Sequence, residues 1–413
     1  MKKRILIVGQ KISTLVKYLD DNGYDYIVLK DLKRTIFPDR KFKRRVLCDF
    51  SNRETVLSAV ETIKKPIHGV VATYETYILP AAWIAEHLRL PGIPVESAEA
   101  CTDKFIMRSL FSQALEKISP DFRIIKSEND VYDFAKTHDL PLIIKPANLS
   151  KSLLVTKSQN LGELLANYQK TISVIDDIYL KYAPDRKPKL LIEEFMEGSI
   201  HSVDAFIDKE GKPQVLNQIV DYQTGYDIGY DDNFHYSRVI PSQLSKDEQQ
   251  ILRHCAETGI RALGMKNSPA HVEIIMTKEG PRIVEIGARN GGYRERMHKL
   301  ANGIDITGAA LSLAMGSQPS IIATKNEACA VLEIFPRTKG VFRGIAHEET
   351  LRNLPSIKSV LIKARLGDSI GRSSDGYKTP LILILQALDY ETLNRDLLII
   401  REKIRVLTST DSA

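Results

Sequence analysis

The sequence predicts a multidomain α/β protein, and three observations support this. Its 413 residues exceed the usual length of one domain and suggest two to four. The first hundred residues alternate apolar strands with helices, an order typical of a parallel sheet covered by helices. Residues 271–292 read as two short strands joined by a tight turn, which indicates a hairpin.

The alternation in the first hundred residues can be followed element by element. We expect strands at 4–8, 26–29 and 68–73, and helices at 13–22, 53–64 and 79–88. A dinucleotide-binding fold would carry G-x-G-x-x-G after its first strand, but Gly9 stands alone in VGQKIST. Dinucleotide binding is therefore not expected in this part of the chain.

A second α/β unit follows a helix that begins after Asp103. Its expected strands are 122–125, 142–145, 153–156, 190–194, 202–208 and 214–222, and its expected helices are 129–137, 160–168, 245–263 and 304–315. Ser245 and Glu248 have the spacing of a capping box at the start of the third of these helices. Residues 171–189 and the Tyr/Asp/Gly-rich residues 222–238 are predicted loops.

After residue 325 the chain is expected to form a smaller unit. It has strand patterns at 328–335, 359–364 and 381–387, and a helical pattern at 391–403. The longest apolar stretch, residues 306–322, is interrupted by glycine, glutamine and proline, so no membrane span is expected. The four cysteines have no paired spacing, which favours a reducing cytoplasm over a disulfide framework or zinc site.

The net charge of +6 is concentrated in one segment. Between Lys30 and Arg45 there are eight Lys or Arg and two Asp, a surplus equal to the whole excess. A nucleic-acid-binding patch would also need aromatic partners or a recognition motif. We interpret the segment as a solvated loop and expect no nucleic-acid partner.

Two glutamates stand out in the predicted hairpin. Glu273 and Glu285 each lie among aliphatic residues, and residues 278–281 read as the turn. A turn centred on Glu279 would place the two carboxylates opposite each other on one face, with Cβ atoms about 5 Å apart. Mg²⁺ prefers oxygen ligands and would remove their repulsion. The alternative is a solvated hairpin face with two unrelated glutamates.

The order of several charged residues carries a resemblance. Lys104 opens a helix, Lys145 ends the apolar strand LPLIIK, and LLIEEFMEG runs from 190 to 198, before Glu273, Glu285 and Arg289. This order resembles the ATP-grasp superfamily, and within it the carboxylate–amine ligases, including the L-amino-acid ligases. The resemblance covers essentially the whole chain. It implies an ATP-grasp fold with a parallel-sheet domain at 1–102, a linker helix and mobile lid subdomain at 103–205, a catalytic subdomain at 206–324 and a C-terminal α+β lobe at 325–413.

The resemblance also implies roles for individual residues. Lys104 and Lys145 match the phosphate-binding lysines, and Glu273 and Glu285 would hold Mg²⁺ or Mn²⁺. Arg289 matches the arginine that faces the transferred phosphoryl group or the substrate carboxylate. The expected adenosine contacts are Glu193, Glu194, Phe195 and Met196, with Glu197 or His201 reaching the ribose. His271 shares a strand face with Glu273, and either contacts the substrate or hydrogen-bonds Glu273.

The sequence departs from the family pattern in three places. The loop after Lys145 has no glycine, and Ser150, Lys151 and Ser152 would supply its phosphate contacts instead. Gly287 stands where the family often has an Asn metal ligand, and Ile200 where many members have Glu. Farther along, the segment with Tyr226, Tyr230, His235 and Arg238 is expected to help select the carboxylate or the amine.

The resemblance implies an ATP-dependent ligase that activates a carboxylate, expected to be an amino acid or small peptide, and joins it to an amine. One alternative is a bicarbonate-activating enzyme similar to biotin carboxylase. Another is a non-catalytic, ATP-binding regulatory protein, which the glycine-free loop would favour. The expected partners are small molecules and a second copy of the chain in a homodimer.

Overall fold

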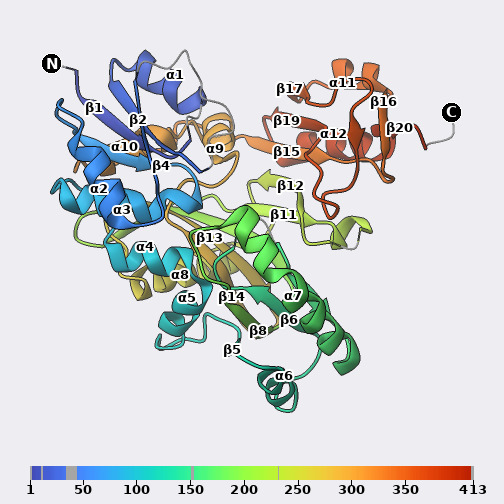
Figure 1. The fold of residues 1–413 in the computed structure, drawn as a ribbon. Coiled ribbons are helices and arrows are strands. Elements are labelled where there is room, and N and C mark those ends of the chain that lie inside the picture. The colour runs from blue at the N-terminus through green and yellow to red at the C-terminus, as the bar shows by residue number, and fades with distance from the viewer. Residues whose placement is uncertain (1, 11–12, 34–43, 150–152, 231, 411–413) are drawn as a thin grey trace.

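The computed structural model describes residues 2–10, 13–33, 44–149, 153–230 and 232–410, and the chain has the predicted α/β architecture. Figure 1 shows an N-terminal sheet with its helices, a lid below it, a central large sheet and a C-terminal lobe. Ser150, Lys151, Ser152 and most of the basic segment lie outside the described residues. Of the helices in the described ranges, none combines the length and the apolar character needed to cross a membrane.

The N-terminal sheet is parallel, as predicted, with strand order β3-β2-β1-β4. Its strands are β1 (Arg4–Val8), β2 (Asp25–Asp31), β3 (Arg45–Cys48) and β4 (Gly69–Ala72), and its helices are α1 (Ser13–Asp21), α2 (Arg53–Glu61), α3 (Ile78–His87) and α4 (Val95–Thr102). All five residues of β1 are buried, which explains the apolar run at 5–8 after Arg4. Gly9 has φ +98°, and a Cβ there would lie 2.0 Å from the Tyr77 ring, so this glycine serves packing.

The lid is a four-stranded antiparallel sheet of order β5-β8-β6-β7, covered by two helices. Its elements are β5 (Phe122–Ile125), α6 (Glu128–Ala135), β6 (Leu142–Pro146), β7 (Thr156–Ser158), α7 (Leu161–Tyr182) and β8 (Leu190–Glu194). The predicted loop at 171–189 is wrong as far as Tyr182, where α7 ends, and residues 183–189 form the loop that follows. Its buried residues recur every three or four positions and form one apolar face against the sheet: Leu164, Tyr168, Thr171, Ile175 and Tyr179.

The central sheet has the order β14-β13-β9-β11-β12-β15-β19-β17, with β10 paired to β9. Its strands are β9 (Ser199–Ile207), β10 (Pro213–Val215), β11 (Val220–Thr224), β12 (His235–Ile240), β13 (Ser268–Thr277), β14 (Gly280–Gly287), β15 (Ala328–Ile334), β17 (Ile357–Ile362) and β19 (Leu381–Ala387). Its neighbouring helices are α5 (Lys104–Phe111), α8 (Lys246–Ala262), α9 (Arg294–Asn302) and α10 (Ile306–Ala314). The capping box of Ser245 and Glu248 is confirmed at the start of α8.

The residues at 222–238 are only partly loop, contrary to the prediction. They contain the end of β11, the short η2 (Tyr226–Ile228) and the start of β12, which pairs with β11. His235 and Arg238 therefore lie on a strand. Hydrogen bonds between the backbones of β11 and β12 explain how strands form in so polar a sequence.

The C-terminal lobe adds a small sheet and two helices to three strands of the central sheet (Figure 1). The small sheet has the order β18-β16-β20, and the elements are β16 (Gly340–Ala346), α11 (Glu348–Asn353), β18 (Ser369–Ile370), α12 (Tyr390–Lys403) and β20 (Arg405–Thr408). The limits between the four predicted domains stay predictions. The limit expected between residues 205 and 206 falls inside β9, so the central sheet begins before it.

Candidate active site at the glutamate hairpin

Glu273 and Glu285 are cross-strand partners on the β13–β14 hairpin. The turn begins one residue earlier than predicted. Thr277 and Gly280 are the last paired residues of the two strands, and only residues 278 and 279 lie between them. A register shift between Glu273 and Ile274, where Val284 has no partner, brings the two glutamates opposite each other again. The Glu273 side chain is 18% exposed and the Glu285 side chain 35%, so both carboxylates are partly buried but accessible to solvent.

The electrostatics around the pair favour two ionised carboxylates. The charge of Lys104, whose Nζ lies 3.0 Å from Glu285 Oε2, lowers the pKa of Glu285 against the effect of burial. Burial raises the pKa of Glu273, but a hydrogen bond with His271 and the neighbouring cations outweigh it and lower that pKa. Two adjacent carboxylates kept ionised and partly open suit a hard divalent cation such as Mg²⁺.

Lys104 joins the linker helix to this site. It is the first residue of α5, whose N-cap Asp103 accepts from the backbone amides of Phe105 and Ile106. Besides its ion pair with Glu285, its ammonium donates to the carbonyl of Leu149 at 3.2 Å. Leu149 adjoins the undescribed residues 150–152, so Lys104 lies between the loop after β6 and the hairpin.

Lys145 and Glu193 form a buried ion pair with an arginine that the sequence reading missed. Lys145 Nζ lies 2.6 Å from Glu193 Oε2, and Arg108 Nε lies 3.1 Å from Glu193 Oε1. Arg108, fully buried, also donates to the carbonyls of Ile283 at 3.0 Å and Val284 at 2.9 Å. The cluster thus connects the lid to the hairpin. Burial lowers the pKa of Lys145 to about 8, despite the opposing charge of Glu193.

The residues predicted to contact adenosine differ in whether their side chains already have partners within the protein. The Glu193 carboxylate is committed to Lys145 and Arg108, so it points into the protein. Glu194 accepts from the backbone amide of Asp121 at 2.9 Å, and the Lys157 ammonium lies 3.7 Å from the centre of the Phe195 ring. Phe195 and Met196 are half-buried in the segment that leaves β8.

His201 does not offer a free nitrogen to a ribose in this arrangement. Its Nε2 lies 2.6 Å from Ser199 Oγ and its Nδ1 lies 2.7 Å from Asp221 Oδ1. The side chain is buried on β9. The physical reason is local, because Asp221 on the paired strand β11 stands directly beside it in register.

His271 lies on β13, two residues before Glu273, and its imidazole contacts that carboxylate. Its Nδ1 lies 2.7 Å from Asp204 Oδ1, and its Nε2 lies 3.5 Å from Glu273 Oε1. Asp204 also pairs with His298 at 3.0 Å and with the fully buried Arg294 at 3.4 Å. The Nε2 atom lies nearer to the Tyr222 hydroxyl, at 3.2 Å, than to Glu273, and both roles named for His271 stay predictions.

Arg289 reaches across to the N-terminal domain. Its Nε lies 3.1 Å from Oε2 of Glu75, which begins the short η1 (Glu75–Tyr77) just after β4. The sequence reading missed Glu75. The signal that could have found it is its place after the carboxyl end of a parallel strand, where such sheets commonly bind ligands.

The four residues expected to select substrates lie in three different surroundings. His235 packs on Tyr222 with ring centres 4.1 Å apart, and burial lowers its pKa to about 4, although the nearby Glu273 opposes that shift. Arg238 instead pairs with Glu333 of the C-terminal lobe at 2.9 Å. Tyr226 and Tyr230 lie in the turn between β11 and β12. His235 thus lies close enough to the glutamate hairpin for Glu273 to affect its pKa.

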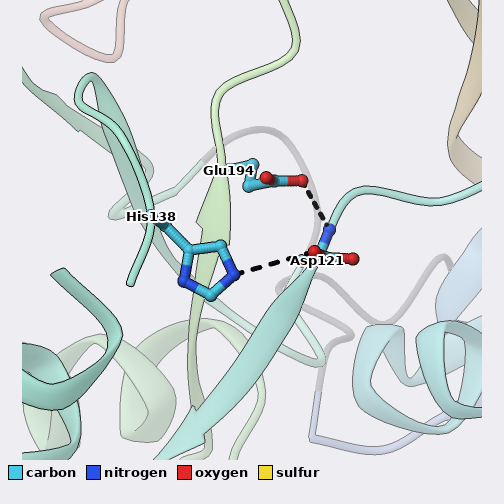
Figure 2. Close-up of side chains that lie close together, drawn as sticks. All are labelled: Asp121, His138 and Glu194. Atoms are coloured by element: carbon cyan, nitrogen blue, oxygen red, sulfur yellow. Dashed lines mark hydrogen bonds and ion pairs between the residues drawn. The ribbon is translucent and has the colours of Figure 1, made fainter. Parts of the chain in front are cut away.

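A second cluster, Asp121, His138 and Glu194, lies on the lid (Figure 2). In the described ranges it is the one group of three or more possible metal-binding side chains whose ligand atoms all lie within 4.8 Å of one another. The ammonium of Lys117 already lies 3.2 Å from Asp121 and 3.7 Å from Glu194, and Asp121 is exposed. A protein cation therefore balances these carboxylates, and we assign no metal to them.

Comparisons with known proteins find one matching domain family and a matching fold. A family model described as the ATP-grasp domain matches residues 138–295. The fold matches that of an L-amino acid ligase from Bacillus licheniformis with a TM-score of 0.80 and 20% identity over 99% of both chains.

Two sequence relatives extend the comparison. Alanine–anticapsin ligase of Bacillus subtilis is 24% identical over 275 residues, which are 60% of this chain and 57% of that protein. An uncharacterised protein of Sinorhizobium fredii is 22% identical over 331 residues, 79% of this chain and 66% of that one. The chain thus spans less than two thirds of the length of these relatives. Residues 138–295 thus match the ATP-grasp domain family, and the likeness in fold to the L-amino acid ligase extends over 99% of the chain.

Proposed function

We propose that the protein is an ATP-dependent ligase that activates a carboxylate as an acyl phosphate and joins it to an amine, releasing ADP and phosphate. The observation that carries the proposal is the cross-strand pair of Glu273 and Glu285, with Lys104 at one carboxylate and Arg289 close by. The ligase names of relatives, alanine–anticapsin ligase and L-amino acid ligase, support this class of reaction.

The proposed nucleotide site lies between the lid and the central sheet. Lys145 from β6 and Lys104 from α5 supply the cations for the phosphates of ATP. Phe195 and Met196, on the segment that leaves β8, would contact the adenine. Mg²⁺ or Mn²⁺ held by Glu273 and Glu285 would neutralise charge on the phosphates as the phosphoryl group is transferred.

The reaction needs no covalent bond to the protein. A carboxylate oxygen of the first substrate attacks the γ-phosphorus, and the bond from that phosphorus to the bridging oxygen of ADP breaks. The amine then attacks the acyl carbon, the bond to the phosphate oxygen breaks, and the amine loses a proton. Arg289 would hold the carboxylate or the transferred phosphoryl group through its planar guanidinium. Rate enhancement comes from positioning and charge neutralisation.

A release assay tests the proposal and separates it from the regulatory alternative. Purified protein with ATP, Mg²⁺ and pairs of amino acids should release phosphate faster for particular pairs than for ATP alone. Binding of ATP with no stimulated release by any pair would favour the regulatory alternative. Stimulation by bicarbonate alone would favour the bicarbonate-activating alternative.

The substitution Glu285→Gln tests the metal assignment. Gln keeps the shape of the side chain but removes the charge, so turnover should fall at least about 100-fold, as when other transition-state electrostatic groups are removed. Glu279→Gln is the matched control, since this exposed glutamate lies in the turn of the same hairpin. Near-normal turnover in Glu285→Gln would contradict the assignment. Far-ultraviolet circular dichroism verifies that both variants fold.

A further inference from the structure

Ser199, His201 and Asp221 form a chain of hydrogen bonds outside the glutamate hairpin. Oγ of Ser199 lies 2.6 Å from Nε2 of His201, and Nδ1 of the same imidazole lies 2.7 Å from Oδ1 of Asp221. The backbone amide of Gln243 donates to the other carboxylate oxygen of Asp221 at 2.8 Å. The carboxylate is thus held on one side by a backbone amide and on the other by the histidine.

The register of the central sheet brings these three side chains together. Ser199 and His201 are two residues apart on β9, so they share one face of the sheet. His201 is the direct partner of Asp221 where β9 pairs with β11. The arrangement therefore follows from the pairing of two strands.

This face of the sheet is turned away from the glutamate pair. Where β13 pairs with β9, Glu273 is the partner of Ser202 and Ile274 is the partner of His201. Neighbouring residues of a strand point to opposite faces. Ile274 belongs to the apolar core that contains Leu252 of α8. The histidine is therefore separated by the sheet from the proposed metal site.

The chemistry of the partners fixes the direction of the hydrogen bonds. A carboxylate only accepts, so Nδ1 of His201 carries a proton and donates to Asp221. Nε2 then accepts from the hydroxyl of Ser199. A serine that donates to an imidazole, with a carboxylate orienting that imidazole, is the arrangement of a nucleophile and its general base.

Exposure to solvent changes along the chain in the order that such chemistry needs. Ser199 is exposed, whereas His201 is 3% exposed and the Asp221 side chain is 24% exposed. The backbone amides of Glu197 and Gly198, directly before the serine, donate to no other group among the residues that the structure describes. They are available to an oxygen atom that becomes negatively charged during a reaction at the serine.

We propose that Ser199 is a nucleophile, separate from the ligase site, that removes the acyl group from small esters. Oγ of Ser199 attacks the ester carbon while its proton passes to Nε2 of His201, which then gives that proton to the departing alcohol. Water next attacks the acyl-serine and gives a proton to His201, which returns it to Oγ as the carboxylic acid leaves. An exposed serine at the start of a strand favours small esters with good leaving groups, because these need little binding surface.

Two probes test the inference without ATP or metal. p-Nitrophenyl acetate should release nitrophenolate and place an acetyl group on Ser199. Diisopropyl fluorophosphate should form a stable phosphoryl adduct at the same hydroxyl, with loss of fluoride. Mass spectrometry of the peptides locates both adducts. Ser199→Ala should remove them, and His201→Gln and Asp221→Asn should each slow their formation about 100- to 10,000-fold, the range for general-base catalysis.

Ser173→Ala is the matched control. Ser173 is an exposed serine of α7 whose hydroxyl donates to the carbonyl of Lys170 at 2.8 Å, so this variant should react like the wild type. Circular dichroism verifies the fold of each variant, and Ser199→Ala removes only an exposed hydroxyl, so it keeps the test valid if a variant at a less exposed position does not fold.

The inference is overturned if the wild type carries no adduct on Ser199, or if Asp221→Asn folds and reacts as fast as the wild type. In the first case the serine is not a nucleophile, and in the second the hydrogen-bond chain does not activate it. Neither probe needs ATP, so these results would leave the ligase proposal standing. Labelled Ser199 without any amino-acid-stimulated phosphate release would reject the ligase proposal alone.

Discussion

Lys145 is a buried lysine whose charge depends on its partners, and this predicts proton uptake when ATP binds. With a pKa of about 8, because burial disfavours the charged form, it is about half protonated at pH 8 in the free protein. The phosphates of ATP favour the charged form and raise that pKa. Binding at pH 8 should therefore take up about half a proton, and ATP affinity should fall as the pH rises through 8.

Calorimetry in two buffers of different ionisation enthalpy measures this uptake. Lys145→Met should lose it, whereas the exposed Lys136→Met should keep it. At pH 6.5 the uptake should nearly vanish in the wild type, since Lys145 is then already charged. The same uptake in Lys145→Met would assign the proton to another group.

The residue scale also shows what a sequence can reveal about a site. Glu273 and Glu285 could be predicted because a charge inside an apolar strand is conspicuous, and their pairing is confirmed. Arg108 and Glu75 could not, because one is an ordinary basic residue on a helix and the other follows a strand of a different sheet. Their importance comes from tertiary contacts with Glu193 and Arg289, which no local pattern encodes.

At the scale of elements, α7 is the instructive case. The prolines and charges of YAPDRKPK suggested a loop from residue 171, although the apolar spacing continues unbroken to Tyr179. Proline and glycine indicate that an element ends somewhere nearby, whereas the apolar periodicity indicates the last residues that belong to it. The hairpin shows a related limit, because the register shift at Val284 depends on pairing and is invisible in the sequence.

The buried face of α7 predicts how the lid is stabilised. Ile175 is 6% exposed in the lid core, and Ile175→Ala should lower the free energy of local unfolding of the lid by about 2–5 kcal/mol. Hydrogen exchange should accelerate in β6 and β8 and stay unchanged in β1 and β2, which belong to another sheet. Ile172 lies on the same helix and is 44% exposed, so Ile172→Ala should change hydrogen exchange in neither region. Equal effects of the two variants would exclude one-sided packing of α7.

At the scale of the whole molecule, the central sheet joins parts that the sequence suggested were separate. β12 and β15 pair from Ser237 to Ile240 across the predicted limit at residue 324. One apolar cluster also spans that limit; its buried members are Val220, Ile240, Met297, Ala301, Cys329, Val331, Ile382 and Ile384. Composition and element order predicted the parts and their class, but the continuous sheet depends on long-range pairing.

This continuity predicts that residues 1–324 do not fold stably without the C-terminal lobe. A chain shortened to residues 1–324 would leave the β12 edge unpaired and expose half of that cluster, at about 1.5–3 kcal/mol for each buried aliphatic side chain lost from the core. Scanning calorimetry should show no cooperative transition for the shortened chain and no rise in melting temperature with Mg²⁺ and ATP, whereas binding should raise that of the intact chain. A chain shortened only to residues 1–410, which keeps every described strand, should melt like the intact one. If residues 1–324 melted cooperatively and were stabilised by ATP, the lobe would be an independent domain, and the shared sheet would add little to the stability of the site.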